Sequence, residues 1–240
     1  MRTVKRAIIM AAGTGNRLNP ITLTIPKPLV EVNGKRMIDT IIDGLLANGI
    51  TEIHVVVGYL KEQFYCLLEK YPDLHFIDNP YYNECNNIAS LYVAREYIDD
   101  VIILDGDQLV NDINALSPEF EHSGYNAVWT DEPTKEWLMS LQNGIVCDCS
   151  RNGGKCGWKL YSVSRWSRED GEKLRRQLEI EFEKNKNRQI YWDDVPMFCY
   201  PEEYKLGIRK MRDGDVVEID TAKELVEVDP TYQKFLKEKE

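Results

Sequence analysis

The chain has 240 residues, of which 43% are hydrophobic and 29% charged, and its net charge is −10. This size and composition are typical of one globular domain, and the acidic balance argues against nucleic acid as the main partner, because a phosphate backbone would be repelled. No apolar run approaches the roughly 18 residues of a membrane span, so we expect no membrane insertion and a cytoplasmic location.

The first half of the chain reads as alternating strands and helices. Strands are predicted at residues 4–10, 52–57, 74–77 and 101–104, and helices at residues 36–48, 60–70 and 87–97. Near-continuous apolar strands separated by helices indicate a parallel sheet that is buried on both faces. The sequence therefore predicts an α/β fold with a mostly parallel central sheet.

After residue 110 the predicted strands become shorter and are interrupted by polar residues. We expect strands at residues 127–130, 137–141, 145–149, 158–164 and 216–219, a charged helix at 168–186 and a lysine-rich surface helix at the C-terminal end. Asn143-Gly144 predicts a hairpin turn. Since no repeat, low-complexity tract or linker interrupts the chain, we expect one domain over residues 1–240 with a mixed second half.

A glycine-rich turn follows the first predicted strand, in the stretch AAGTGNRLNPITLTIPKPL (residues 11–29). Backbone N–H groups of such a turn bind anions. It is not a Walker A loop, because Asn16-Arg17 follows the second glycine, and it lacks the third glycine of a dinucleotide fingerprint, where Leu18 stands. A short phosphate loop remains, and the alternative is an ordinary turn with solvated basic residues.

Two cations accompany the loop. Arg17 lies within it, and Lys27 stands between Pro26 and Pro28, which restrict the backbone and hold the lysine out of a helix. A pre-positioned ammonium group suits a reaction that must bring two anions together.

This stretch resembles the signature of the sugar-phosphate and alcohol-phosphate nucleotidyltransferases, a strand followed by AAGxGxRLxP and then PKPL or PKAL. The resemblance implies a Rossmann-like nucleotidyltransferase fold and catalytic roles for Lys27 and Arg17. It also implies that residues 1–110 bind a nucleoside triphosphate and residues 111–240 bind the acceptor. The residues implied to hold the triphosphate are Ala11, Ala12, Gly13, Thr14 and Gly15.

Acidic residues follow two of the predicted strands. Asp105 and Asp107 end the apolar strand at 101–104, and Asp220 ends the last strand. The resemblance implies that Asp107 and Asp220 bind Mg²⁺, which neutralises the triphosphate, with Asp105 next to the nucleotide. The alternatives are an Asp-Gly turn at residue 105 and a helix N-cap at residue 220.

The stretches VVGYLKEQF (56–64) and NPYYNECNNIASLYVA (79–94) resemble the bacterial CTP:phosphocholine cytidylyltransferases. The resemblance implies CTP as the nucleotide and contacts with it from Gly58, Asn86, Asn87 and Ser90. An asparagine side chain offers the paired donor and acceptor that match a pyrimidine edge. The alternative role for Asn86, Asn87 and Ser90 is to cap a helix.

Aromatic and acidic side chains are paired in the second half, in Glu136-Trp137 and in Tyr191-Trp192-Asp193. The stretch YWDD resembles the same cytidylyltransferases, and this combination suits a quaternary ammonium group. The alternative is that these aromatic residues fill a core, as we expect for Trp129, Trp158 and Trp166.

The sequence therefore predicts CMP transfer from CTP to phosphocholine, giving CDP-choline and pyrophosphate. A primary amine would bind the same acids, so 2-aminoethylphosphonate and phosphoethanolamine stay open as acceptors, as do sugar 1-phosphates. A catalytically silent nucleotide sensor is a third hypothesis. The expected partners are CTP and a small phosphorylated amino alcohol, and a homo-oligomer is left open.

The six cysteines are expected as free thiols. Cys147, Cys149 and Cys156 suggest a zinc site only weakly, because no CxxC or histidine pair accompanies them.

Overall fold

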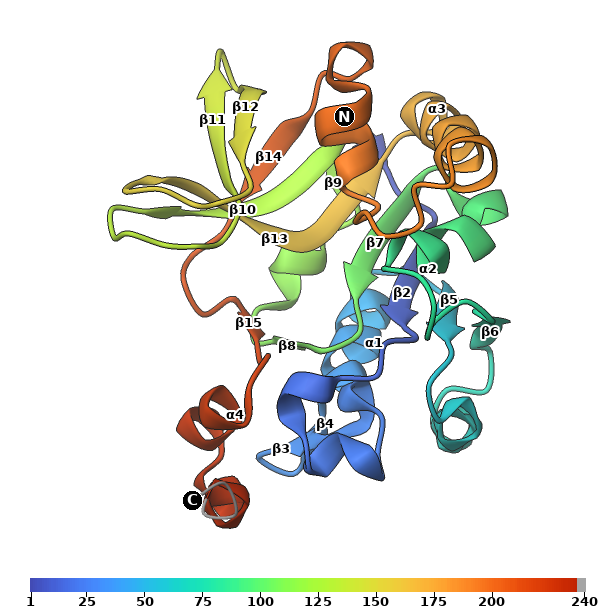
Figure 1. The fold of residues 1–240 in the computed structure, drawn as a ribbon, viewed down its shortest axis with the longest axis vertical. Coiled ribbons are helices and arrows are strands. Elements are labelled where there is room, and N and C mark those ends of the chain that lie inside the picture. Colours follow the sequence, from blue (N-terminus) through green and yellow to red (C-terminus); the bar gives the residue numbers. More distant parts are fainter. Residues whose placement is uncertain (237–240) are drawn as a thin grey trace.

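The computed structural model describes residues 1–236 and is built around a nine-stranded sheet (Figure 1). The strand order is β10-β14-β12-β11-β13-β7-β2-β5-β6. The strands of this sheet are β2 (Arg6–Ala11), β5 (Glu52–Val57), β6 (His75–Asp78), β7 (Val101–Asp105), β10 (Gly124–Thr130), β11 (Leu138–Gln142), β12 (Ile145–Ser150), β13 (Gly157–Trp166) and β14 (Gly207–Lys210).

The strands of the sheet are parallel on one side and mixed on the other. Strands β7, β2, β5 and β6 are parallel, whereas β13 joins β7 in the antiparallel sense. Strand β10 also pairs with β13, so the five strands of the second half curl into a ring at one edge. Three small sheets complete the strands, formed by β1 (Arg2–Thr3) with β9 (Glu119–Phe120), β3 (Glu31–Val32) with β4 (Lys35–Arg36), and β8 (Gln108–Val110) with β15 (Val216–Glu218).

Helices cover both faces of the parallel strands, as their apolar patterns require. Helix α1 (Met37–Ala47) packs its isoleucines and Leu45 against one face, together with Ile9 of β2. Helices α2 (Ile88–Val93) and α3 (Arg168–Glu179) pack against the other face, onto which the neighbouring Ile8 points. Successive side chains of a strand point to opposite faces, so both faces of the apolar β2 are buried.

The remaining helical segments are short. Helix α4 (Ala222–Val228) begins with a capping box at Thr221 and Glu224. The 3₁₀ segments are Asn16–Leu18, Ile21–Leu23, Lys27–Leu29, Lys61–Glu69, Arg95–Tyr97, Ile113–Leu116, Pro201–Glu203 and Pro230–Phe235, and the π-helical turns are Ile180–Lys184 and Val195–Cys199.

The fold class predicted from the sequence is confirmed, and each predicted strand is present to within a few residues. The helix predicted at 60–70 is a 3₁₀ helix, and the one predicted at 168–186 ends in a π-helical turn. The predicted C-terminal helix consists of α4 and the turn Pro230–Phe235, and its last four residues, 237–240, lie outside the described residues.

Two expectations for tryptophans were wrong. Trp192 was expected in the acceptor cage, but its side chain is only 1% exposed and packs between Tyr125 and Trp166. Trp129 was expected in the core, but it is 48% exposed because it lies near the outer end of β10. Trp166 is fully buried, as expected, and Trp158 is partly buried.

None of the helices formed by residues 1–236 is long and apolar enough to cross a membrane. All six cysteines are free thiols. Within the same residues, no three His, Cys, Asp or Glu side chains gather as a metal site would require, and Cys147 instead donates to the carbonyl oxygen of Ser140.

Candidate active site

The glycine loop leaves the end of β2 and is shaped by Gly15. Gly15 has a left-handed backbone (φ 64°), and a Cβ atom there would lie 3.0 Å from the Cβ of Lys27 and 3.1 Å from the Cγ2 of Thr22. The Thr22 hydroxyl donates to the Gly15 carbonyl oxygen over 2.9 Å, and the buried Leu18 anchors the following turn. Only glycine fits this combination of conformation and close packing.

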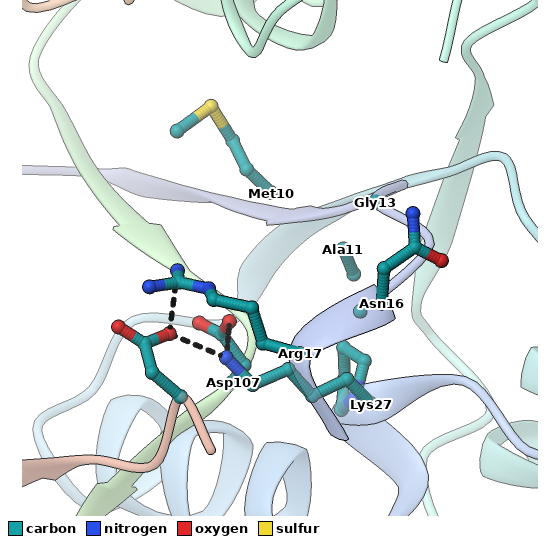
Figure 2. Close-up of a pocket in the computed structure, with 10 residues that line it drawn as sticks. Met10, Ala11, Gly13, Asn16, Arg17, Lys27 and Asp107 are labelled. Carbon is teal, nitrogen blue, oxygen red and sulfur yellow. Dashed lines mark hydrogen bonds and ion pairs between the residues drawn. The ribbon is translucent and has the colours of Figure 1, made fainter. Parts of the chain in front are cut away.

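The loop brings Lys27 and Arg17 to two carboxylates (Figure 2). The Lys27 ammonium lies 2.6 Å from Asp107 Oδ2 and 2.9 Å from Asp220 Oδ1. Arg17 Nη2 contacts the same Asp220 oxygen over 2.9 Å. Four residues from three separated parts of the sequence therefore converge on one cluster, which lines a cavity of about 270 Å³ together with Gly13 and Gly15.

Asp220 reaches Asp107 because of one strand pairing. Strand β15 runs antiparallel to β8, with Glu218 opposite Gln108, so the residues that follow β15 meet those that precede β8. Asp220 also donates its backbone N–H to Glu224, and the helix N-cap is Thr221. The capping role considered for Asp220 is thus filled by its neighbour, and the Asp220 carboxylate faces Lys27.

The Lys27 ammonium stays charged in spite of its burial. Lys27 is only 6% exposed, and burial alone would lower its pKa. The charges and hydrogen bonds of Asp107 and Asp220 outweigh burial and raise the pKa, so the ammonium stays protonated.

Asp107 and Asp220 also fit a divalent cation. Both carboxylates already approach one positive charge to within 3 Å, and oxygen ligands of this kind are those that Mg²⁺ prefers. Two protein carboxylates suffice, because Mg²⁺ usually keeps waters and takes substrate phosphates as its other ligands.

A second cavity, of about 330 Å³, extends from the loop towards the start of α2. It is lined by Ala12, Gly13 and Thr14 of the loop and by Asn86, Asn87 and Ser90. The sequence interpretation missed Asn79 and Tyr82, which also line it. They stand in the loop before α2, where only the folded chain reveals which side chains face inward.

The two asparagines connect the start of α2 to the segment 188–192. Asn86 donates to the Gln189 carbonyl oxygen, and the Asn87 side-chain oxygen accepts from the Trp192 N–H over 2.9 Å. Neither side chain caps α2. Ser90 instead accepts from Asn79.

Gly58 has a packing role. A Cβ atom at Gly58 would lie 2.8 Å from the Tyr82 side chain. Because Tyr82 lines the cavity and Gly58 does not, the glycine acts on the cavity through this tyrosine.

A third cavity, of about 280 Å³, lies on the other side of the cluster, against the mixed strands. Its walls are rich in carboxylates. The acidic residues that line it are Asp105, Asp107, Glu136, Asp193, Glu218 and Asp220, and its other linings include Arg17, Asn87, Trp137, Leu160, Ser162 and Tyr191. A concave site with so many acids attracts cations.

The aromatic wall of this cavity has two rings. Trp137 and Tyr191 meet edge to face, with ring centroids 6.0 Å apart, and Tyr191 is 49% exposed. Phe198 packs against Trp137, and the Arg151 guanidinium lies over Phe198 and pairs with Asp194 over 2.5 Å. With Trp192 in the core, the expected cage of three aromatic side chains is reduced to Trp137 and Tyr191.

Several carboxyl groups here have raised pKa values. Burial raises the pKa of Asp193 to about 7, and it raises that of Asp105 well above its ordinary value, with Asp107 adding to the effect. The Glu218 side chain is exposed as a whole, but protein atoms crowd its carboxyl group and Asp107 lies near, so its pKa rises to about 7. A bound cation would relieve this repulsion.

Glu218 and Ser162 were missed by the sequence interpretation. Glu218 ends β15 and stands two residues before Asp220, so its closeness to Asp220 in the sequence was a usable signal. Ser162 had none, because its place depends on how β13 crosses the sheet.

Comparisons with known proteins agree with this geometry. The family model described as Nucleotidyl transferase matches residues 6–127. A 2-aminoethylphosphonate cytidylyltransferase of Lancefieldella rimae is 34% identical over 233 residues, which cover 96% of this chain and 94% of that protein. A choline-phosphate cytidylyltransferase of Streptococcus pneumoniae is 31% identical over 91% of this chain and 94% of its own length.

Solved structures of nucleotidyltransferases share the fold of this chain. The CTP:phosphocholine cytidylyltransferase of Streptococcus pneumoniae superposes with a TM-score of 0.88 at 31% identity, covering 95% of this chain and 99% of that one. The inositol-1-phosphate CTP transferase of T. maritima shares the fold, with a TM-score of 0.77 at 17% identity. A chain with this loop, this cluster and these relatives belongs to the nucleotidyl transferase family.

Proposed function

We propose that this chain transfers CMP from CTP to a small phosphorylated or phosphonylated amine and releases pyrophosphate. The observation that carries the proposal is the convergence of Lys27, Arg17, Asp107 and Asp220 between the glycine loop and a cavity rich in carboxylates. The relatives that cover most of the chain and use CTP support the choice of nucleotide. In this proposal residues 1–110 bind the nucleotide and residues 111–240 the acceptor, within one domain.

The proposed chemistry needs no general base. The acceptor's phosphate or phosphonate oxygen is already anionic near pH 7, and it attacks the α-phosphorus of CTP as the bond to the β-phosphate oxygen breaks and pyrophosphate leaves. Lys27 would hold the acceptor and α-phosphate oxygens. Arg17 and the loop amides of Gly13 to Gly15 would hold the β- and γ-phosphates. Mg²⁺ held by Asp107 and Asp220 would neutralise charge on the triphosphate.

The base would lie in the cavity at the start of α2. Asn86, Asn87 and Ser90 line it with Tyr82, whose ring offers a face for stacking. The side-chain oxygens of Asn86 and Asn87 already accept bonds from backbone N–H groups of the protein, so their remaining amide donors are the groups that would meet the base.

A primary amine fits the acceptor cavity best. A primary ammonium can donate three N–H bonds to carboxylates, and the Asp193 carboxyl has a buried oxygen without a hydrogen-bond partner among the described residues. The relative that acts on 2-aminoethylphosphonate supports this substrate as the first candidate.

Phosphocholine is the second candidate, favoured by the edge-to-face pair of Trp137 and Tyr191. A quaternary ammonium binds aromatic faces and cannot donate N–H bonds. The burial of Trp192 removes one of the rings expected to serve it. Two aromatic faces are still available, and the choline-phosphate relative supports this acceptor.

The test is a pyrophosphate-release assay with Mg²⁺ that crosses the four nucleoside triphosphates with 2-aminoethylphosphonate, phosphocholine, phosphoethanolamine and glucose 1-phosphate. Among the four triphosphates we expect turnover only with CTP, and among the acceptors we expect the highest kcat/KM with 2-aminoethylphosphonate. A preference for phosphocholine would mean that the aromatic pair of Trp137 and Tyr191, and not the carboxylates, selects the acceptor. Turnover with the sugar phosphate would reject the amine site, and CTP binding without pyrophosphate release from any pair would indicate a nucleotide sensor.

A further inference from the structure

A cavity of about 400 Å³ lies away from the proposed active site, at the end of the sheet where the parallel strands begin. It is bounded by Met1, by residues 117–125 and by strand β14. Arg165 of β13 lines it and pairs with Ile102, near the start of β7, whereas Asp105 ends that strand. Ile102 and Asp105 are three residues apart on β7, so they are separated by roughly 10 Å along the strand. In Figure 1 the N-terminus and β9 lie at this end, opposite the arrowheads of β2 and β7.

Two arginines that line this cavity form no ion pair with a carboxylate of residues 1–236. Arg165 is 2% exposed, and within residues 1–236 no acidic oxygen lies within ion-pair distance of it or of Arg209. Arg165 donates to three neutral oxygens, those of Ser117, Ala115 and the Asn126 side chain, each over 2.7 Å. Three bonds leave two of its five N–H donors for another partner.

Arg209 is partly buried and also has donors left over. One of its terminal nitrogens donates to the Glu119 carbonyl oxygen, while its Nε is buried without a hydrogen-bond partner among the described residues. Burial, together with the neighbouring charge of Arg209, lowers the pKa of Arg165 to about 9. Arg209 itself is only partly buried, and the charge of Glu119 acts on it. The buried Arg165 forms no ion pair within residues 1–236, and a buried positive charge beside a like charge is costly, so the arrangement favours a bound anion.

The other linings define the entrance. Glu119 and Glu121 are exposed and form the rim, where water and salt screen their charges, and His122 lies beside them. Arg165 lies inside, where screening is weaker, and Arg209 is partly buried. Guanidinium groups match tetrahedral oxyanions through paired N–H donors, so the chemistry points to a phosphate-type ligand.

We propose that Arg165 and Arg209 form a binding site for a phosphate-type oxyanion, separate from the glycine loop. The site depends on no substrate of the transfer reaction. It lies on β13, the strand that also carries Ser162 of the acceptor cavity, so an anion bound here would contact a strand shared by both sites.

The probe is inorganic phosphate, compared with sodium chloride at equal ionic strength, with the melting temperature as the readout. All measurements use the Arg17→Ala, Lys27→Ala background, which removes the cations of the glycine loop. We expect phosphate at ten or more times its Kd to raise Tm by about 2–4 °C in this background. Arg209→Gln should abolish most of the rise. Arg212→Gln, which removes an exposed arginine near the end of β14, should leave it unchanged.

A second measurement does not depend on how the variants fold. In ¹H–¹⁵N spectra of the wild-type protein, phosphate should shift the side-chain Nε–H resonances of Arg165 and Arg209. The proposal is overturned if phosphate fails to raise Tm in the loop-deficient background, if Arg209→Gln and Arg212→Gln respond alike, or if those two resonances do not move. None of these outcomes bears on pyrophosphate release, so the site and the proposed function fail separately.

Discussion

At the scale of single residues, the proposed chemistry depends most on Lys27, a buried ammonium between two carboxylates. We expect Lys27→Ala to lower kcat/KM for pyrophosphate release about 100-fold or more, because one charged donor at a transferring phosphoryl group contributes on this order. Lys35→Ala is the control, since Lys35 pairs with Asp43 on the surface. Turnover near the wild-type rate in Lys27→Ala would contradict the assignment.

The two tryptophans of the predicted cage should now behave differently. Trp137→Ala should raise the acceptor KM about 5- to 30-fold with little loss of stability, because a cation over an aromatic face gains roughly 1–2 kcal/mol. Trp192→Ala should instead destabilise the protein by about 3–5 kcal/mol, as other deletions of a buried aromatic ring do. Steady-state kinetics and urea unfolding of both variants test this. Equal effects on KM at equal stability would place Trp192 back in the site.

The pH dependence of acceptor binding should reveal Asp193. Its pKa of about 7 means that the carboxylate forms as pH rises from 6 to 8, so the acceptor KM should fall over this range. The acceptor phosphate also titrates near pH 6, and Asp193→Asn separates the two effects because it keeps only the substrate's contribution. An identical pH profile in this variant would remove Asp193 from the acceptor site.

Asp193 should also affect stability, with a definite sign. A carboxyl whose pKa is higher in the folded than in the unfolded chain binds more protons when folded, so its contribution is favourable at low pH and is lost as pH rises from about 4 to about 7. The free energy of unfolding of Asp193→Asn relative to wild type should therefore increase between pH 5 and pH 8, by about 2–4 kcal/mol. Urea unfolding at both pH values measures it, and a constant difference would show that Asp193 is not buried as described.

At the scale of elements, the glycine loop has a conformation that a matched pair of variants can test. Gly15 and Gly214 both have left-handed backbones, but a Cβ atom meets Lys27 and Thr22 at Gly15 and nothing within 4 Å at Gly214. Both substitutions to alanine should cost about 1 kcal/mol of stability. Only Gly15→Ala should also lower kcat, by about 10-fold or more, since it displaces Lys27. Equal activity in the two variants would mean that the loop adapts.

The elements of the parallel half could be predicted because each one carries its own pattern. The apolar strands β2, β5 and β7 and the isoleucine stripe of α1 are visible in the sequence. The short strands β8, β14 and β15 are harder, because pairing with distant residues defines them more than composition does. The β8–β15 pairing is the element that brings Asp220 to Lys27.

At the scale of the whole molecule, the two proposed halves share one sheet and one core. Strand β13 of the second half pairs with β7 of the first, and the core that contains Trp166 and Trp192 also contains Ile8 and Val56. All five tryptophans follow residue 128, so their fluorescence reports the second half alone. We expect thermal unfolding followed by tryptophan fluorescence and by far-UV circular dichroism to coincide. Two separate transitions would reject the single-domain proposal.

The sequence by itself determined the fold class and the glycine loop, because these follow from local patterns, and the motif's resemblance singled out Lys27, Asp107 and Asp220, which the structure brings together. Only the tertiary structure decided which side chains share a cavity. It placed Trp192 in the core, added Glu218 and Ser162 to the proposed acceptor cavity, and brought Arg165 and Arg209 to one cavity without an ion pair to any carboxylate of residues 1–236. The reason is physical: burial and charge pairing depend on contacts between residues far apart in the chain, and no local pattern records those contacts.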